Sequence, residues 1–370
     1  MAKLFERTRL GKLELANRLV RSATWMGLAT GDGQVTADLI EVMEMLARGG
    51  AGLIVTGHAY VSPEGQASPR QLGAYADHLV EGLARMAGAV HGRGGKIVLQ
   101  LAHAGVFART NLTGMPALAV SRTGKFEPGK CRVIEAEDIE RLVSDFVAAA
   151  KRAVEAGFDG IQLHAAHGYL LGQFISPLFN RRTDRYGGSA AGRTLLCRRI
   201  LAAVRATVGP AFPVLIKMNS SDLSPGGLSP DQAVEAAAYL AKEGVCAIEI
   251  SGGLPRGGGL SPTWTGIDSP DKEAYFSSEA SLFRKNLDVP LILVGGIRSF
   301  EVAANIVEQG LTDLVAMSRP FICEPDLAAR WQAGDRRPAR CRSDNLCFGP
   351  GLAGKGVRCV TFRKAVRTGS

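Results

Sequence analysis

Two histidines and a tyrosine lie close together after an apolar segment near the middle of the sequence. His164 and His167 are three residues apart, and Tyr169 follows two residues after the second histidine. Imidazole N–H groups can donate hydrogen bonds to an oxygen that gains negative charge, and a phenol can give up a proton as a general acid. The spacing therefore indicates a site that stabilises a developing oxyanion and protonates a nearby atom.

Two other interpretations of these residues stay open. A histidine pair can bind a metal ion, but no third ligand is obvious, because His103 is the only other histidine next to a predicted strand end. The pair can also be structural, with Tyr169 as a packed aromatic side chain. We favour binding of a substrate carbonyl oxygen by His164 and His167, and we predict no metal ion at this site.

Short apolar segments alternate with segments of helical periodicity along most of the chain. Strands that alternate with helices and are apolar on both faces form parallel sheets. Eight such strand-like segments occur, at residues 18–22, 51–57, 96–102, 158–164, 212–219, 246–251, 290–296 and 313–318. Eight strand–helix units in about 300 residues predict an α/β fold, the (β/α)8 TIM barrel.

The other segments fit this organisation. A doubly wound open sheet is the alternative, but the segment after the first strand lacks the G-x-G-x-x-G fingerprint. The sequence TRLGKLEL predicts an N-terminal hairpin that caps the barrel floor, with its turn at residues 11–12. We assign residues 1–335 to the barrel and residues 336–370 to a basic tail that contains cysteines. Residues that favour helix caps precede several predicted helices, at Thr36, Ser229 and Ser299.

The ends of the predicted strands carry many polar residues and glycines. In a parallel barrel these ends meet at one mouth, where active sites of this fold lie. The loops after the last two strands contain Gly295-Gly296 and Ser318-Arg319. Bare backbone N–H groups and a cation in these two loops form the usual phosphate site of the fold. The sequence therefore indicates a phosphorylated ligand, and flavin mononucleotide (FMN) is one candidate.

Composition and charge exclude several classes of protein. With 46% hydrophobic and 21% charged residues, the chain can bury a large core, and its seven scattered cysteines do not suggest a secreted disulfide framework. No segment approaches the run of about 20 apolar residues that spans a bilayer, so we expect a cytoplasmic protein without a membrane partner.

The net charge is +9, and residues 319–370 hold +7 of it, from eleven Lys or Arg against four Asp or Glu. This tail lacks the elements of a nucleic-acid binder, so we expect a small-molecule substrate and no nucleic acid.

Several motifs resemble the Old Yellow Enzyme family of FMN-dependent oxidoreductases, and together they cover nearly the whole chain. The most specific combines His-x-x-His-Gly-Tyr-Leu with Ser-Pro-x-x-Asn-x-Arg-x-Asp-x-Tyr-Gly-Gly in residues 157–189. The others are LANRLVRSAT at residues 15–24, QLAHAG at 100–105, VGGI at 294–297 and SRPFICEPDL at 318–327.

The resemblance implies FMN across the barrel mouth. Lys217 would lie near the N1–C2=O end of the flavin, where well-known members carry arginine and where a cation favours the reduced form. His164 and His167 would bind the substrate carbonyl oxygen, and Tyr169 would supply a proton. The residues implied to contact the cofactor are Ser22, Ala23, Thr24, Gly57, Gln100, His164, Lys217, Gly295, Gly296, Ser318 and Arg319.

These roles match the reduction of an electron-poor C=C bond. A hydride delivered from flavin N5 to the β-carbon leaves an enolate, which imidazole donors stabilise and a phenol protonates at the α-carbon. We predict an FMN-dependent NAD(P)H oxidoreductase of the ene-reductase kind, acting on enones or enals. The alternatives are a flavin dehydrogenase or demethylase that works oxidatively with an electron-transfer partner, and a flavin-free TIM-barrel lyase or isomerase.

The C-terminal segment resembles part of a cluster-binding motif found in a related branch of the family. That branch has C-x2-C-x2-C followed by a distant fourth cysteine and binds a [4Fe–4S] cluster. Here Cys341, Cys347 and Cys359 are present, and Asp344 stands at the second position. Because such clusters prefer four thiolates, we expect a vestigial motif, with a cluster or zinc as alternatives. The branch often has a second domain that binds a dinucleotide, which we do not find in this chain, so NADH or NADPH or a partner protein would supply electrons.

The sequence contains no readable code for the substrate or for the choice between NADH and NADPH. We expect the loops at residues 102–134 and 252–276 to shape the substrate pocket. The basic tail could reach a neighbouring subunit in a homo-oligomer.

Overall fold

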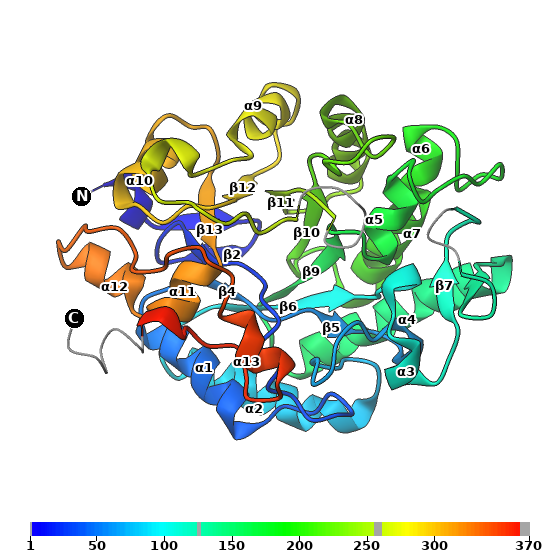
Figure 1. Ribbon diagram of the computed structural model, residues 1–370, viewed down its shortest axis with the longest axis horizontal. Helices are drawn as coiled ribbons and strands as arrows, with labels where there is room; N and C mark the ends of the chain where they lie inside the picture. Colours follow the sequence, from blue (N-terminus) through cyan, green and yellow to red (C-terminus); the bar gives the residue numbers. More distant parts are fainter. Residues whose placement is uncertain (1, 124–126, 255–260, 363–370) are drawn as a thin grey trace.

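A closed barrel of parallel strands forms the centre of the molecule (Figure 1). The computed structural model describes residues 2–123, 127–254 and 261–362. The barrel strands follow the order β4-β3-β13-β12-β11-β10-β9-β6, and the pairing of β4 with β6 closes the ring. These strands are β3 (Leu19–Arg21), β4 (Leu53–Val55), β6 (Ile97–Ala102), β9 (Gly160–Ala165), β10 (Val214–Asn219), β11 (Ala247–Ser251), β12 (Leu291–Val294) and β13 (Leu314–Met317). Each of the eight predicted strands is found, and the predicted TIM barrel is confirmed.

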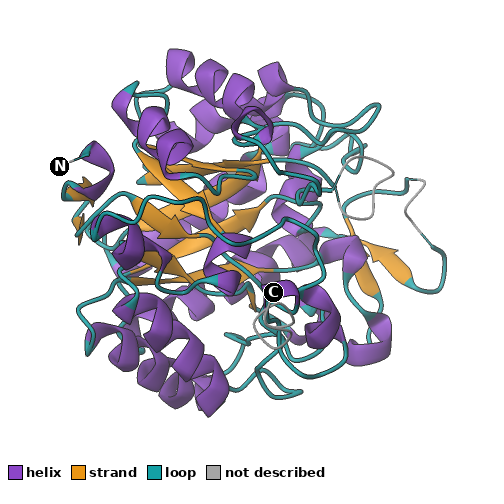
Figure 2. Ribbon diagram, turned by 60° about the vertical axis from the view of Figure 1, so that its left-hand side comes forward, coloured by secondary structure: helices purple, strands orange, loops and turns teal. Residues whose placement is uncertain are grey.

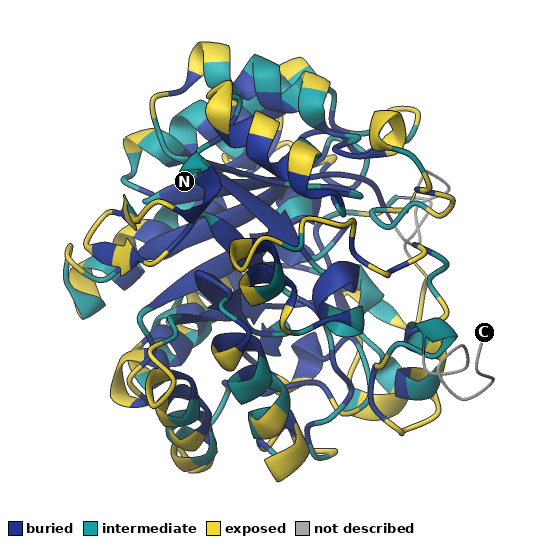
Figure 3. Cartoon of the chain, turned by 90° about the vertical axis from the view of Figure 1, so that its left-hand side faces the viewer, coloured by how far each residue is buried: buried dark blue, intermediate teal, exposed yellow. Residues whose placement is uncertain are grey.

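Amphipathic helices surround the strands, as Figure 2 shows. Their apolar faces pack on the outer face of the barrel and form one large core. The strands are buried on both faces (Figure 3), which explains why their sequences are almost continuously apolar. The main helices are α1 (Ala37–Arg48), α2 (Val80–His91), α4 (Ala136–Glu155), α7 (Leu195–Val208), α8 (Pro230–Lys242), α9 (Ser277–Asn286), α10 (Phe300–Glu308) and α12 (Leu327–Gln332).

An N-terminal hairpin closes the floor of the barrel, as the sequence predicts. Strands β1 (Thr8–Leu10) and β2 (Leu13–Leu15) pair antiparallel around a turn that contains Gly11, whose φ of +58° favours glycine. Leucines of this hairpin pack against side chains inside the barrel near the start of its strands, including Leu53 and Leu215. The floor is therefore filled with apolar side chains, and the polar mouth is left for chemistry.

Two of the three predicted helix caps form as expected. The side-chain oxygen of Thr36 accepts a hydrogen bond from the backbone of α1, and that of Ser229 does the same for α8. Ser299 precedes α10, but its hydroxyl donates to the carboxylate of Glu273 and does not cap the helix. Glu273 also accepts hydrogen bonds from the backbone N–H groups of Arg298 and Ser299, so its carboxylate holds the start of α10.

Short helices and strands lie in the connections between the main elements. They are β5 (Ala59–Tyr60), α3 (Thr110–Thr113), β7 (Ala117–Ala119), β8 (Cys131–Val133), α5 (Leu170–Ile175), α6 (Ala190–Arg193) and α11 (Arg319–Cys323). The C-terminal segment, with α13 (Phe348–Leu352), packs on the barrel, since the backbone N–H of Val357 donates to the carbonyl of Met26 over 2.7 Å. The domain boundary after residue 335 stays a prediction, and residues 363–370 of the predicted tail lie outside the described residues. No helix in the described part of the chain is both long and apolar enough to cross a membrane.

The barrel interior gives a test of how the fold is stabilised. Leu215 is fully buried beneath the mouth, so Leu215→Ala should lower the free energy of unfolding by about 2–5 kcal/mol. Leu112→Ala is the matched control, because Leu112 on α3 is 40% exposed. Urea titration followed by far-UV circular dichroism measures both, and equal losses for the two variants would contradict this account of the core.

Candidate active site

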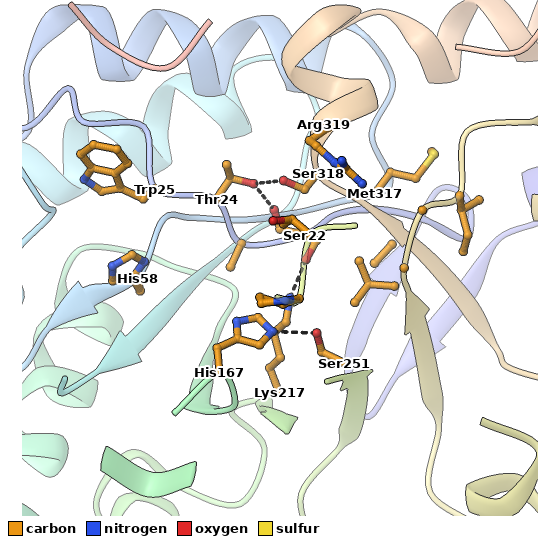
Figure 4. A pocket seen from close by; sticks show the side chains of 18 of the residues that line it. Ser22, Thr24, Trp25, His58, His167, Lys217, Ser251, Met317, Ser318 and Arg319 are labelled. Atoms are coloured by element: carbon orange, nitrogen blue, oxygen red, sulfur yellow. Dashed lines mark hydrogen bonds between the residues drawn. The ribbon is translucent and has the colours of Figure 1, made fainter. Parts of the chain in front are cut away.

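A cavity of about 1040 Å³, including its open mouth, lies at the carboxyl ends of the barrel strands (Figure 4). It brings together residues that are up to 326 positions apart in the chain, from Ser22 to Phe348. Gly57 lines a smaller neighbouring cavity together with Trp25 and His58, which also line the main cavity. The predicted site residues that line the main cavity are Ser22, Ala23, Thr24, Gln100, His164, His167, Tyr169, Lys217, Gly295, Gly296, Ser318 and Arg319.

The end of strand β9 places the predicted catalytic residues. His164 is buried on the strand, and the chain then turns sharply, with φ of +58° at His167 and +74° at Gly168. A left-handed conformation is uncommon for histidine and is typical of functional sites. The side-chain oxygen of Asn219 on β10 accepts a hydrogen bond from the backbone N–H of His167 over 3.0 Å and holds the turn.

Four aromatic rings cluster at this turn. The ring of Tyr169 lies 4.5 Å from that of His164 and 5.2 Å from that of His58, measured between centroids, and the two histidines of the motif are 5.4 Å apart. The hydroxyl of Tyr169 and Nε2 of His58 form a hydrogen bond of 3.1 Å. His58 is a residue that sequence reasoning missed, because it lies in a loop and belongs to no recognised motif. Its position three residues after the end of the second barrel strand, β4, is the signal that could have identified it.

The three histidines at the cavity are neutral near pH 7. Burial lowers the pKa of His58 to about 4. Burial is also the main cause that lowers the pKa of His164 and His167 well below the ordinary value, and the charge of Lys217 lowers both further. Each neutral imidazole has one N–H donor and one acceptor nitrogen.

The two motif histidines differ in their hydrogen bonding. Nε2 of His167 lies 2.7 Å from the hydroxyl of Ser251, at the end of β11. Nδ1 of His164 is buried and has no hydrogen-bond partner among the described residues. His103 does not line the cavity, and its Nδ1 accepts from the backbone N–H of Gly105. It therefore does not complete a metal site with the pair.

A buried ion pair lies beside the histidines. Nζ of Lys217 donates to Glu249 and to the hydroxyl of Ser22, each over 2.9 Å. Gln162 donates to the other carboxylate oxygen of Glu249 over 2.8 Å and accepts from Gln100 over 2.7 Å. Lys217 and Glu249 are almost completely buried. Glu249 was not predicted, although an acidic residue inside the apolar strand segment CAIEIS is the signal that marks it.

The charge of Glu249 follows from its partners. Burial alone would raise the pKa of this carboxyl group, but the charge of Lys217 and the hydrogen bonds from Lys217, Ser22 and Gln162 lower it below the ordinary value. Glu249 is thus ionised and balances much of the positive charge of Lys217.

The predicted phosphate loops lie on the other side of the cavity. Gly295 and Gly296 have φ of +140° and +70°, and a Cβ atom on either would come within about 3 Å of Tyr275. The glycines are therefore needed for backbone conformation and close packing as well as for bare N–H groups. The hydroxyls of Thr24 and Ser318 lie 2.6 Å apart.

The loop after β11 covers this end of the cavity. Pro262, Thr263 and Tyr275 line the cavity, and the rings of Tyr275 and Trp264 stack with centroids 4.4 Å apart. Arg319 donates to the carbonyl of Trp264 over 2.7 Å. The predicted loop at residues 252–276 thus shapes the pocket, although residues 255–260 lie outside the described residues. The loop at 102–134 contributes no described residue to the cavity lining, and residues 124–126 are not described.

The C-terminal cysteines lie at a separate, smaller cavity. Cys341, Cys347 and Cys359 line it together with Asp344. The carboxylate of Asp344 has partners within the protein. It accepts hydrogen bonds from the backbone N–H of Leu346 and from the hydroxyl of Thr361. Among the described residues no group of three His, Cys, Asp or Glu side chains is arranged to hold a metal ion. Cys323 of α11 lines the same cavity, so four cysteines lie around it.

A parallel barrel with a polar mouth and glycine-rich final loops is the architecture of barrel enzymes that bind phosphorylated ligands. A model of the NADH:flavin oxidoreductase / NADH oxidase family matches residues 3–337, and the chain belongs to this family. The resemblance to the Old Yellow Enzyme family is thereby confirmed, and an old yellow enzyme homologue from Zymomonas mobilis superimposes with a TM-score of 0.75 at 31% identity. That match covers 89% of this chain and 92% of the homologue.

Curated relatives differ in length. A metal reductase from Desulforamulus reducens is 36% identical over 99% of this chain, and the match spans 54% of the relative. A 4,4'-dithiodibutanoate disulfide reductase from Rhodococcus erythropolis is 34% identical over 99% of this chain and 98% of its own length. The chain thus spans about half of the first relative and nearly all of the second.

The site fits the flavin and nicotinamide cofactors that the family implies. The unpaired Nδ1 of His164, the backbone of Gly295 and Gly296, and a fixed cation at Lys217 supply polar contacts along the cavity.

The ion pair can be tested without any cofactor. Lys217→Met leaves Glu249 buried without its cation, which should lower the free energy of unfolding by about 3–5 kcal/mol. Adding Glu249→Gln should restore most of this loss, because the buried charge is removed. Lys272→Met, in an exposed pair with Asp268, is the control and should change stability little. If the double variant were no more stable than Lys217→Met, the unpaired charge of Glu249 would not be the cause of the lost stability.

The buried histidines predict a pH dependence of stability. Their pKa is lower in the folded than in the unfolded protein, so the unfolded state binds more protons below about pH 6.5. Stability contributed by neutral His58 should therefore be present above its ordinary value of 6.5 and be lost as the pH falls towards about 4. His58→Gln should reduce this loss in urea titrations at several pH values, whereas His78→Gln on the surface should not. Identical profiles for wild type and His58→Gln would rule the explanation out.

Proposed function

We propose that this protein is an FMN-dependent NAD(P)H oxidoreductase that reduces C=C bonds conjugated to a carbonyl group, as in enones and enals. The observation that carries the proposal is the buried Nδ1 atom of His164, a residue that lines the cavity, which has no hydrogen-bond partner among the described residues. An unpaired buried polar atom costs about 1–3 kcal/mol. A ligand oxygen that accepts a hydrogen bond from the imidazole would remove this cost.

FMN, when bound, would take a hydride from NADH or NADPH and pass it to the substrate. Lys217 would stabilise negative charge at the flavin ring, because it is a buried and fixed cation. We assign the ring contacts to Ser22, Ala23, Thr24, Gly57, Gln100, His164 and Lys217, and the phosphate contacts to Gly295, Gly296, Ser318 and Arg319.

His164 and His167 would hold the carbonyl oxygen of the substrate. Both are neutral, so they donate hydrogen bonds without bringing a full positive charge to the site. Ser251 can donate its O–H to Nε2 of His167, and this would keep the N–H of that ring on Nδ1. Negative charge that develops on the substrate oxygen would strengthen these hydrogen bonds in the transition state.

Tyr169 would protonate the substrate carbon. Its hydroxyl contacts Nε2 of His58, and a neutral imidazole can pass a proton from one nitrogen to the other. We therefore assign His58 the role of returning a proton to Tyr169 after each turnover. The cytoplasmic location and the homo-oligomer stay predictions from the sequence.

The proton-donor role predicts a selective loss of rate. Tyr169→Phe should slow reoxidation of the reduced flavin by 2-cyclohexenone by about 10²–10⁴-fold, while flavin reduction by NADPH stays unchanged. Stopped-flow absorbance separates the two half-reactions, and Tyr239→Phe on α8 is the matched control. Full reoxidation rate in Tyr169→Phe would show that another group supplies the proton.

Three further measurements decide the wider proposal. The double variant His164→Ala with His167→Ala should lose the long-wavelength absorbance that phenols give with oxidised flavin, if these residues bind the substrate oxygen. A purified protein that is colourless and takes up no added FMN would contradict the proposal as a whole. Turnover of 4,4'-dithiodibutanoate, the disulfide in the name of the R. erythropolis relative, without turnover of any enone would replace the proposed substrate class.

A further inference from the structure

Arg319 carries a positive charge inside the protein, at the predicted phosphate end of the main cavity. It is only 6% exposed, and it lines the cavity from the start of α11 (Figure 4). Its guanidinium group donates to neutral oxygens of Trp264 and Asn345, and no carboxylate in the described part of the chain pairs with it. A buried cation without a counter-ion is unfavourable, so Arg319 is suited to an anionic ligand in the cavity.

The two hydrogen bonds occupy one corner of the guanidinium group. Nη1 donates to the carbonyl of Trp264 over 2.7 Å and to Oδ1 of Asn345 over 3.0 Å, which uses both of its hydrogens. Nε and Nη2 have no hydrogen-bond partner among the described residues. Together they form an edge that can donate two parallel hydrogen bonds to a phosphate group. The protein thus fixes the orientation of the guanidinium group and leaves one donor edge available.

Asn345 belongs to the C-terminal segment and joins two parts of the cavity wall. While its Oδ1 accepts from Arg319, its Nδ2 donates to the carbonyl of Thr263 over 2.9 Å. A guanidinium group only donates and a carbonyl group only accepts, so both ends of the amide have matching partners. Thr263 lines the same cavity as Arg319. The amide therefore connects α11 with the loop that covers the phosphate end.

The backbone places this amide in an uncommon way. Asn345 has a φ of +60°, a left-handed conformation that asparagine tolerates better than most residues. Sequence reasoning missed Asn345, because it lies between two cysteines of the cluster-like motif and gains its partners only when the segment folds onto the barrel.

We propose that Asn345 is a positioning residue for the phosphate group of the flavin. It holds Nη1 of Arg319 so that the Nε–Nη2 edge of the guanidinium group is ready to bind the phosphate. This inference rests on the proposed function, because it takes FMN as the ligand. Without Asn345, the long side chain of Arg319 loses one of its two anchors, and ordering it on binding costs conformational entropy. The C-terminal segment thereby gains a function in holding the cofactor.

A purely structural contact would have a different signature. If Asn345 only attached the C-terminal segment to the barrel, its loss would weaken the binding of FMN and of riboflavin alike. Riboflavin has the same ring system and lacks the phosphate. If Asn345 acts through Arg319, only FMN binding weakens, and only while Arg319 is present.

The test measures dissociation constants of FMN and riboflavin for the full chain freed of flavin, from the quenching of flavin fluorescence. The wild type should bind FMN more tightly than riboflavin. Asn345→Gly removes the amide and keeps the left-handed backbone accessible. It should weaken FMN binding about tenfold, as expected for the loss of one hydrogen bond to a charged group, and leave riboflavin binding unchanged.

Two further variants show whether the effect passes through the guanidinium group. Arg319→Met should lower the affinity for FMN to near that for riboflavin. Adding Asn345→Gly to Arg319→Met should cause no further loss of FMN affinity, because coupled residues are not additive. Leu346→Ala is the matched control, since Leu346 is the next residue in the chain and is 58% exposed. It should bind both flavins like the wild type.

The possible failures are distinguishable. Wild-type protein that binds neither flavin contradicts the proposed function, and the inference with it. Three results with Asn345→Gly would overturn the role of Asn345 alone: unchanged FMN affinity, equal losses for both flavins, or the same loss with and without Arg319.

A structure of the wild type with FMN decides the matter even if Asn345→Gly fails to fold. Nε and Nη2 of Arg319 on the phosphate, with Nη1 still bound to Asn345, would support the proposal. A side chain of Arg319 that leaves Asn345 to reach the phosphate, or that does not contact the phosphate, would overturn it.

Discussion

The buried ion pair of Lys217 and Glu249 is the constraint on which the mouth of this barrel depends. Moving either ion alone out of water would cost several kcal/mol, so each can be buried only with the other. The pair is completed by Ser22 and Gln162, which satisfy the carboxylate. Strands β9, β10 and β11 and the end of β3 are thereby joined by polar contacts where an apolar core would otherwise continue.

This pair also sets the electrostatics of the cavity. A lone buried lysine would add a full positive charge beside the histidines. The charge of Lys217 is instead largely balanced by the carboxylate of Glu249. Burial and the remaining positive charge keep the imidazoles neutral, and neutral imidazoles can both donate and accept. The ring cluster of His58, His164 and Tyr169 can therefore share protons without changing the net charge of the site.

The sequence predicts the barrel well because each strand is apolar on both faces and is followed by a helix, which are local patterns. It also predicts most of the cavity lining, because the carboxyl ends of parallel strands must meet. What it misses are contacts between side chains from distant units. The role of His58 depends on its contact with the hydroxyl of Tyr169, 111 residues away. The role of Glu249 depends on its ion pair with Lys217 on the neighbouring strand. From the sequence, Cys323 is only part of a helix; the structure places it beside the cysteines of the C-terminal segment.

The C-terminal segment holds the carboxylate of Asp344 through partners of its own. A partly buried carboxylate at position 344 would be unfavourable without hydrogen-bond partners. Here Thr361 and the local backbone supply them, and the segment keeps its place through Val357 and Asn345. The chemistry of the neighbouring thiols depends on their exposure and on nearby hydrogen-bond donors.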